Sequence, residues 1–510
     1  MPSYQHDQFL GHPKGLYICF ATEMWERFSF YGMKYLLLLY LTKYHLFTDA
    51  MGLDVLGSYA ALVYSTPVIG GLLADRYLGM RKAVIFGGCL LTLGHLGMAF
   101  EGTPAQYLQG NITRDERSLQ VFYFSISLII VGVGFLKPNI STIVGKLYEA
   151  NDPRRDSGFT IFYMGINIGA FVATLLCGYL GETWGWRYGF GAAGIGMIIG
   201  LIIFLFGQRY LQGAAEPHNP LRLKESILPG LNREWLIYIC GVLSLFGFWQ
   251  LVQASHIVEY SLNGLAVIVA IGLIWFILAR CNSVERGRMF VLIALTFSTV
   301  VFWALFEQTA ASMTLYADRV VDRQLFGIEI NASQFGALNP LFIMLLAPVF
   351  AVLWTALAKR KLEPSTPVKF SMGIFQAGLG FGALVIGANF PDESNKVAAI
   401  WLLLAYLLHT SGELCLSPVG LSAVTKLSVP RIVGLMMGTW FLATAYSEYV
   451  AAQIAKLAAI EVTTTKLIDT TIALTRYTDL FGKLFLVGCL AGILLLLLSP
   501  YLKKHMHGIH

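Results

Sequence analysis

Fourteen stretches of mainly apolar residues follow one another along this 510-residue chain, and each is long enough to cross a lipid bilayer as a helix. A spanning helix needs about 20 such residues, and lipid admits only structures that satisfy their backbone hydrogen bonds internally. Charged residues make up 13% of the chain, against about 25% in soluble domains. We therefore predict an all-α integral membrane protein with spans at residues 16–42, 54–74, 83–100, 121–145, 159–181, 188–207, 235–253, 264–281, 289–315, 334–358, 371–388, 396–416, 433–456 and 478–501.

Basic residues predict the orientation. Residues 1–14 are polar and the first apolar stretch continues through a full span, so we expect no cleaved signal peptide and a cytoplasmic N-terminus. With that orientation, 22 of the 36 Lys and Arg residues fall in inner loops and tails when Arg280, at the inner end of its span, is counted with them, as the positive-inside rule requires. We expect a multi-pass protein of the plasma membrane with both termini cytoplasmic. The net charge of +6 follows from these loops, so we expect no nucleic-acid partner.

The arrangement of the spans predicts two halves. A polar segment at residues 208–233, with three prolines, separates the first six spans from the rest. Two spans without Lys or Arg in their interiors follow, and six more complete the chain. We predict a six-helix bundle at 1–207, a linker with an inserted two-helix hairpin at 208–286, and a second six-helix bundle at 287–510. Secondary transporters are often built from two such halves around a substrate site.

Charged residues interrupt the first span. Glu23, Glu26, Arg27, Tyr31 and Lys34 are spaced so that all five lie along one face of a helix. A charge at the centre of a spanning helix costs at least about 2.5–3.5 kcal/mol and usually marks a transport pathway. The alternative is a structural ion pair that joins two helices.

The loop after the second span carries a recognisable signature. Residues 70–82 read Gly-Gly-Leu-Leu-Ala-Asp-Arg-Tyr-Leu-Gly-Met-Arg-Lys. This loop resembles the signature of the major facilitator superfamily, in which small residues let two helices approach and charges hold the cytoplasmic ends together. The resemblance implies a major facilitator fold and a gating role for Asp75 and Arg76.

Further motifs resemble the proton-coupled oligopeptide transporter family, in its prokaryotic form with two extra helices. They are Glu-x-x-Glu-Arg at residues 23–27, runs at 132–141, 158–169, 303–308 and 411–418, the pair Asn339-Pro340, and Trp440. The resemblance implies a symporter that imports di- and tripeptides by alternating access. Its coupling ion is the proton, and we expect neither a cofactor nor a metal.

The chemistry of a short peptide agrees with this implied cargo. A peptide is a zwitterion, so its site needs a positive and a negative pole. Arg27 can bind a carboxylate bidentately and Lys137 can act as a point charge. The resemblance further implies that Glu413, with Asn167 and Asn339, binds the amino end. Lys137 has a second candidate role, in which it pairs with Glu413 and closes the cytoplasmic side.

Aromatic residues could form the walls of the site. The family positions that match Tyr31, Tyr64 and Trp440 line the transport cavity. The alternative for each aromatic side chain is plain packing.

Carboxylates are the candidate proton carriers. We expect Glu307, or the pair Glu23 and Glu26, to take the coupled proton, which would free the basic residues to bind substrate. Lys34 stands where some relatives have Arg, and we expect it to pair with Glu307 as an outer gate. Animal relatives have a His where this chain has Gly57, so coupling must rest on carboxylates.

Other functions remain as alternatives. The same fold could carry nitrate or drug-like molecules. A membrane receptor or enzyme is the alternative from another class, but the sequence shows no metal-ligand spacing, nucleophile motif or sizeable soluble domain. We therefore expect a transporter without catalytic residues, and a monomer whose partners are peptides, protons and the lipid bilayer.

Overall fold

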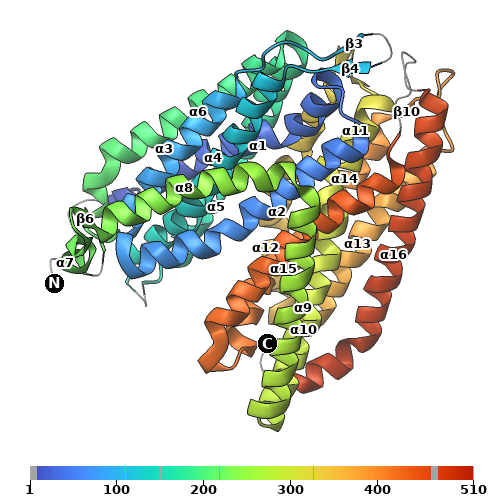
Figure 1. The fold of residues 1–510 in the computed structure, drawn as a ribbon. Helices are drawn as coiled ribbons and strands as arrows, with labels where there is room; N and C mark the ends of the chain where they lie inside the picture. Colours follow the sequence, from blue (N-terminus) through green and yellow to red (C-terminus); the bar gives the residue numbers. More distant parts are fainter. Residues whose placement is uncertain are drawn as a thin grey trace. The chain divides into compact units, whose positions relative to one another are not determined.

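The computed structural model describes residues 8–108, 111–149, 152–217, 219–325, 327–460 and 469–508, and these are mostly helical (Figure 1). The chain ends, predicted to be cytoplasmic, lie outside the described residues. Each of the fourteen predicted spans corresponds to a helix of at least 19 residues. These helices are α1 (Lys14–Leu39), α2 (Asp49–Leu73), α3 (Met80–Met98), α4 (Glu116–Lys146), α5 (Arg155–Tyr179), α6 (Trp186–Gly207), α8 (Arg233–Gln253), α9 (Ser255–Arg280), α10 (Ser283–Phe306), α12 (Leu338–Lys359), α13 (Thr366–Gly387), α14 (Ala399–Leu427), α15 (Val433–Ala455) and α16 (Thr470–His505).

Eleven helical segments of the described residues are long and apolar enough to cross a membrane. The other three long helices are α1, α3 and α15; in α1, the charged residues Glu23, Glu26, Arg27 and Lys34 interrupt the apolar sequence. The all-α membrane fold is thus confirmed. The remaining α-helices and the strands are short: α7 (Pro220–Lys224), α11 (Ser312–Arg319), and the paired strands β1 (Gln8–Phe9), β2 (His12–Pro13), β3 (Gln106–Leu108), β4 (Asn111–Thr113), β5 (Ser226–Leu228), β6 (Leu231–Asn232), β7 (Val321–Asp322), β8 (Gln324–Leu325), β9 (Ile328–Glu329) and β10 (Val397–Ala398).

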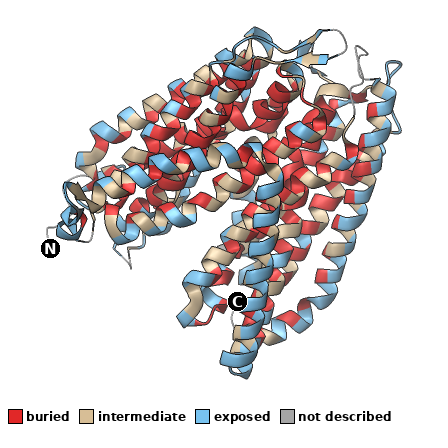
Figure 2. Cartoon of the chain, in the orientation of Figure 1, coloured by how far each residue is buried: buried red, intermediate tan, exposed pale blue. Residues whose placement is uncertain are grey.

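The chain forms two compact units. Unit 1 comprises Met1–Leu46 and Leu62–Ala254, and unit 2 comprises Phe47–Ala61 and Ser255–His510. In unit 1, α1 packs against α5 and α6, and α3 packs against α4 and α6. In unit 2, α13 packs against α14 and α16, and α10 packs against α15. Figure 2 shows buried residues along the helices of each unit. By the bounds of the two units, the first turns of α2 belong to unit 2 and the rest of α2 belongs to unit 1.

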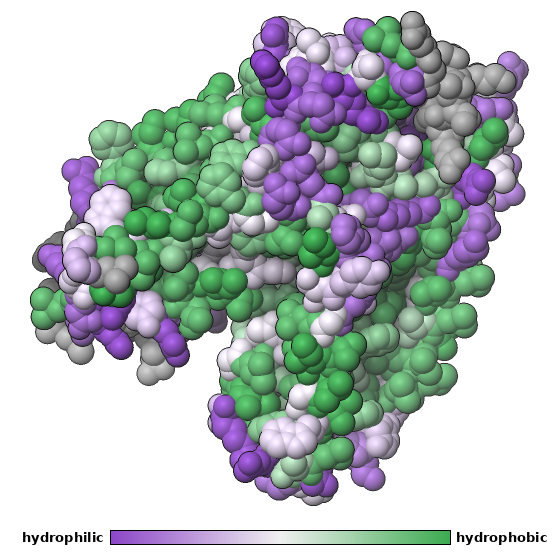
Figure 3. Space-filling view, in the orientation of Figure 1, coloured by the Kyte–Doolittle hydropathy of each residue, from purple (hydrophilic) through white to green (hydrophobic). Residues whose placement is uncertain are grey.

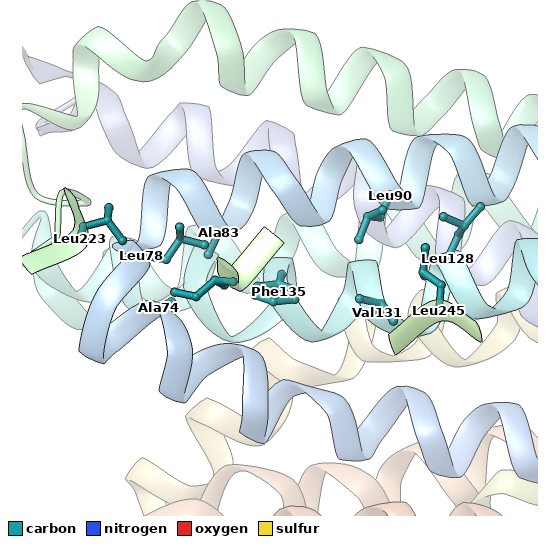
Figure 4. Close-up of a cluster of buried hydrophobic side chains, with 10 residues drawn as sticks. Ala74, Leu78, Ala83, Leu90, Leu128, Val131, Phe135, Leu223 and Leu245 are labelled. Atoms are coloured by element: carbon teal, nitrogen blue, oxygen red, sulfur yellow. The ribbon is translucent and has the colours of Figure 1, made fainter. Parts of the chain in front are cut away.

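The two helices of the inserted hairpin belong to different units. α8 packs against α4 of unit 1, whereas α9 contacts α10 and α15 of unit 2. Buried side chains join α8 to α4, with Leu245 of α8 beside Leu128 and Val131 of α4 (Figure 4). Each buried side chain of this size contributes roughly 1.5–3 kcal/mol when it leaves water, and packing supplies the association inside a bilayer. The predicted domain limits at 207 and 286 stay a prediction.

A close helix approach occurs at the superfamily signature. A Cβ atom on Gly70 of α2 would lie 2.0 Å from the carbonyl oxygen of Gly134 in α4. A glycine is therefore required for these two backbones to touch, and the expectation that small residues bring two helices together here is confirmed. In the same loop, Arg81 Nε donates to Glu216 Oε1 at 2.5 Å, and Lys82 Nζ lies 2.6 Å from Glu234 Oε1. Asp75 and Arg76 are exposed, and their gating role stays a prediction.

Large apolar side chains are exposed on the outward faces of several long helices. The apolar window of α12 is only 6% buried and that of α9 is 11% buried. Figure 3 shows such apolar side chains covering much of the visible helical surface. A soluble monomer rarely exposes this much contiguous apolar surface, so these faces contact lipid in a membrane protein.

Unit 2 also contains a buried ion pair at the start of α2. Both Nη atoms of Arg319 lie 2.6 Å from the carboxylate of Asp49. The hydroxyl of Tyr477 lies 3.0 Å from Arg319 Nη1, and the backbone N–H of Ile460 donates to Asp49 at 2.9 Å. These bonds hold the first turn of α2 to the rest of unit 2.

Candidate functional site

The charged face of α1 forms the first part of the candidate site. Arg27 donates through Nη2 to Glu26 Oε1 at 2.6 Å and through Nε to Glu26 Oε2. Its Nε also lies 3.3 Å from Glu23 Oε1, one helical turn earlier. All three side chains are buried. A single guanidinium therefore neutralises parts of two buried carboxylates, and these ion pairs lie within one helix.

Aromatic rings lie close to three cations of unit 1, Arg27, Lys34 and Lys137. Lys137 of α4 places Nζ 4.3 Å from the ring centre of Tyr64 in α2. The guanidinium of Arg27 lies 4.9 Å from the ring centre of Phe30, and Lys34 Nζ lies 5.9 Å from the same ring. Such cation–π contacts contribute about 0.5–2 kcal/mol. The Phe30 ring thus lies beside two cations.

The charges around Lys137 favour the binding of an anion. Lys137 interacts electrostatically with Glu23, Glu26, Arg27 and Lys34. Three cations and two carboxylates give this group a net charge of +1. The structure thus brings together Glu23, Glu26, Arg27, Lys34, Lys137 and Tyr64, all of them predicted site residues. Tyr31 is partly buried and stacks on Tyr35, with 6.4 Å between ring centres.

Asn167 lies on α5 of unit 1. Its side chain is buried, and Nδ2 donates to the carbonyl oxygen of Tyr163, one turn earlier, at 3.0 Å. Asparagine has two donors and a carbonyl acceptor, so this bond leaves its acceptor for a ligand. Its predicted role at the amino end of the peptide stays a prediction.

The carboxylate group of unit 2 forms the second part of the candidate site. Glu413 of α14 accepts a hydrogen bond of 2.8 Å from Asn339 Nδ2 of α12. The same nitrogen lies 3.2 Å from Thr410 Oγ1. Glu307 lies at the end of α10 and interacts electrostatically with Glu413. Both carboxylates are buried, and the structure places Glu413 in direct contact with Asn339, whereas their binding of the peptide amino end stays a prediction.

The turn that follows α10 fixes the position of Glu307. Residues Glu307–Ala310 form a 3₁₀ turn. Gln308 Nε2 donates to the carbonyl oxygens of Ala304 and Ala451, at 3.2 and 2.9 Å. The side chain of Ser312 donates to Gln308 Oε1 at 2.6 Å. This glutamine is a positioning residue that ties the turn to α15.

Sequence reasoning missed Thr410 and gave no role to His409. Thr410 precedes Glu413 by three residues, and this helical spacing was a usable signal. His409 is buried between helices, where Nε2 lies 3.0 Å from the carbonyl oxygen of Ala377 and the ring lies 4.8 Å from that of Phe381. These contacts make His409 a residue that packs α14 against α13.

Packing within unit 2 surrounds Trp440, a predicted site residue, and Gly57, the position of the histidine in animal relatives. Trp440 is buried, with its ring edge-on to Phe370 at 6.4 Å. A side chain on Gly420 would lie 2.6 Å from the Trp440 ring. A side chain on Gly57 would lie 2.6 Å from Ala452, so this fold has no room for the histidine found there in animal relatives.

Each of the two predicted Lys–Glu gate pairs combines one residue from unit 1 and one from unit 2. Lys34 belongs to unit 1 and Glu307 to unit 2, and the same division separates Lys137 from Glu413. Both pairings stay predictions.

Comparison with known proteins gives one consistent family. The model of the POT family matches residues 81–471. The uncharacterized transporter YclF of Bacillus subtilis (strain 168) is 40% identical, over 98% of this chain and 96% of its own. A di-/tripeptide transporter of Lactococcus lactis subsp. lactis (strain IL1403) is 36% identical over 98% of both chains. The crystal structure of a peptide transporter POT in complex with sulfate superimposes with a TM-score of 0.80 at 34% identity, covering 98% of this chain and 97% of that one.

Proposed function

The chain belongs to the POT family of transporters, and on that premise we propose that it is a proton-coupled symporter that imports di- and tripeptides by alternating access. One observation carries the proposal: the cationic group of Arg27, Lys34 and Lys137 lies in unit 1, and the carboxylate group of Glu307 and Glu413 lies in unit 2. A zwitterionic peptide needs one group of each sign.

Arg27 is our candidate for the peptide carboxylate. Its fork now binds Glu26 bidentately, and a peptide carboxylate has the same geometry. Protonation of Glu26 would remove one of the two carboxylate charges that hold the guanidinium, the other being that of Glu23. The fork is then released to the substrate while Lys137, on the Tyr64 ring, adds a second positive charge.

Glu413 is our candidate for the peptide ammonium. Asn339 donates to one of its oxygens, which orients the carboxylate and leaves acceptor positions for the ammonium protons. Glu307 lies near enough to interact with Glu413. Two buried carboxylates repel each other unless one takes a proton or a cation is present, so either a proton on Glu307 or an ammonium at Glu413 would relieve the repulsion between them.

Location and assembly belong to the same proposal. We place the protein in the plasma membrane with both termini cytoplasmic, working as a monomer in the lipid bilayer. The basic residues of the inner loops support this orientation.

Uptake into proteoliposomes tests the proposal. We expect labelled dialanine to accumulate when the proton gradient is directed inward. Glu23→Gln and Lys137→Ala should each lower uptake about 10- to 100-fold, because each removes one charged partner of a buried group. Lys483→Ala is the matched control, since Lys483 forms an exposed ion pair with Asp479. A folded, inserted protein that takes up no dialanine would overturn the cargo, and nitrate and drug-like molecules would then be tested.

A separate variant tests proton coupling. Glu307→Gln should abolish accumulation against a gradient, because glutamine cannot release a proton. Exchange of labelled for unlabelled dialanine across the membrane should persist. If acid-driven accumulation survives this change, Glu307 does not carry the coupled proton.

A further inference from the structure

Unit 2 contains a polar cavity whose described lining residues include neither Glu307 nor Glu413. Its volume is about 600 Å³, and its walls come from the ends of α12, α14 and α16 and from the start of α13. Lys426 in this cavity follows Glu413 by 13 positions on α14, which is about 20 Å along a helix. Cavities of 300–1,000 Å³ commonly hold small ligands.

The charge of this cavity is strongly positive. Lys361, Lys369, Lys426 and Lys503 line it, and Glu363 is the one acidic residue among its described lining residues. Lys369 is buried, with Nζ 2.5 Å from Glu363 Oε1 and 4.8 Å from the ring centre of Trp354. Glu363 is therefore already bound to a lysine of the wall. The lining residues carry a net charge of +3.

The start of α13 adds to this potential. The helix begins at Thr366, and its N-cap residue Ser365 makes no side-chain capping hydrogen bond. Both residues line the cavity. The N-terminus of a helix carries a partial positive charge and N–H groups that bind phosphate or carboxylate oxygens. A buried lysine, three exposed lysines and a helix start thus surround one space.

Two of the helices whose ends line the cavity also carry exposed apolar side chains. Val352, two turns before the end of α12, is 72% exposed, and Leu497 near the end of α16 is also 72% exposed. In a membrane such side chains contact acyl chains, so the cavity lies at the ends of helices that lipid surrounds. Basic pockets between spanning helices are typical sites for the headgroups of acidic lipids.

We propose that this cavity binds a phosphate group and that its ligand is the headgroup of an anionic phospholipid. The lysines neutralise the phosphate charge, and the backbone N–H of Thr366 at the start of α13 supplies a donor, whereas Pro367 has none. Free inorganic phosphate shares this chemistry and is distinguished by the experiment. The site is separate from peptide transport and does not depend on the proposed function.

Lipid retention measured by native mass spectrometry tests this proposal. The full chain in mild detergent is offered equal amounts of phosphatidylglycerol and phosphatidylcholine. The test variant is Lys361→Gln/Lys426→Gln/Lys503→Gln, whose three side chains are exposed and so tolerate replacement. The control variant is Lys146→Gln/Lys224→Gln/Lys504→Gln, with the same loss of charge at exposed positions outside the cavity. We expect phosphatidylglycerol binding to weaken about fivefold for each cavity lysine removed, and the control to match the parent.

A second arm separates the two sources of phosphate, using the unfolding temperature in the presence of inorganic phosphate alone. The lipid is supported as the ligand if inorganic phosphate does not raise the unfolding temperature and if the parent and the control variant retain phosphatidylglycerol selectively. If inorganic phosphate stabilises the parent but not the test variant, and neither lipid is preferred, the cavity binds phosphate and the lipid is overturned as its ligand. Equal lipid and phosphate responses in the test and control variants would overturn the whole proposal.

Discussion

Replacing Arg27 by methionine is expected to abolish peptide uptake and to lower the free energy of unfolding by about 5 kcal/mol. The change removes the guanidinium that binds Glu26 and Glu23. Both carboxylates are buried, so they would be left close together without this partner. Chemical unfolding in detergent measures the loss, and dialanine uptake into proteoliposomes measures the function.

A double-mutant cycle shows whether the lost charge is the cause. In Arg27→Met/Glu26→Gln the uncompensated carboxylate at position 26 is gone. We expect this variant to recover at least about 2 kcal/mol of the loss, as directly bonded residues show coupling of this size. Equal stability of the single and double variants would contradict the ion-pair account, and shape rather than charge would then explain the loss. Uptake should stay absent in both variants, because neither has the fork for the substrate carboxylate.

Replacing Gly169 by alanine is expected to destabilise unit 1 by about 3 kcal/mol, near the upper end of typical overpacking costs. Gly169 lies where α5 crosses α1, and a Cβ atom there would lie 2.1 Å from the carbonyl oxygen of Met24. A backbone atom cannot rotate away, so the helices must separate. Because Met24 adjoins Glu23 on the helix that carries the charged group, uptake should also fall. Thermal unfolding in detergent and dialanine uptake are the measurements.

Gly247→Ala is the matched control for this prediction. Gly247 lies inside α8 of the same unit, and a Cβ atom there meets nothing within 4 Å. Alanine is better than glycine in a helix by about 1 kcal/mol, so this variant should be as stable as the parent or more stable. Equal destabilisation by the two substitutions would show that the contact with Met24 does not matter.

Several features of the site could be predicted from the sequence because they depend on neighbours along the chain. Glu23, Glu26 and Arg27 are within four residues of each other, and helical spacing places them on one face. The partnership of Asn339 with Glu413 is different, since 74 positions separate them. It was predicted through family resemblance, and spacing alone would not have indicated it.

Other features required the folded chain. Thr410 bonds Asn339, and His409 binds the backbone of α13; both depend on how α14 packs against its neighbours. The role of Phe30 as a ring beside two cations depends on the rotamers of Arg27 and Lys34. The lysine cavity joins four separate helix ends. The spacing of these residues along the chain gives no sign of such groupings.

The sequence by itself determined that this protein is helical and membrane-spanning, and where each long helix lies. The reason is that lipid offers no hydrogen bonds, so an apolar stretch of sufficient length must form a helix regardless of what surrounds it. Only the tertiary structure decided that α8 packs in unit 1 and α9 in unit 2. Both helices are apolar on most of their surface, so hydropathy does not distinguish a face that contacts lipid from one that contacts protein. That choice depends on the fit of side chains such as Leu245 against Leu128 and Val131.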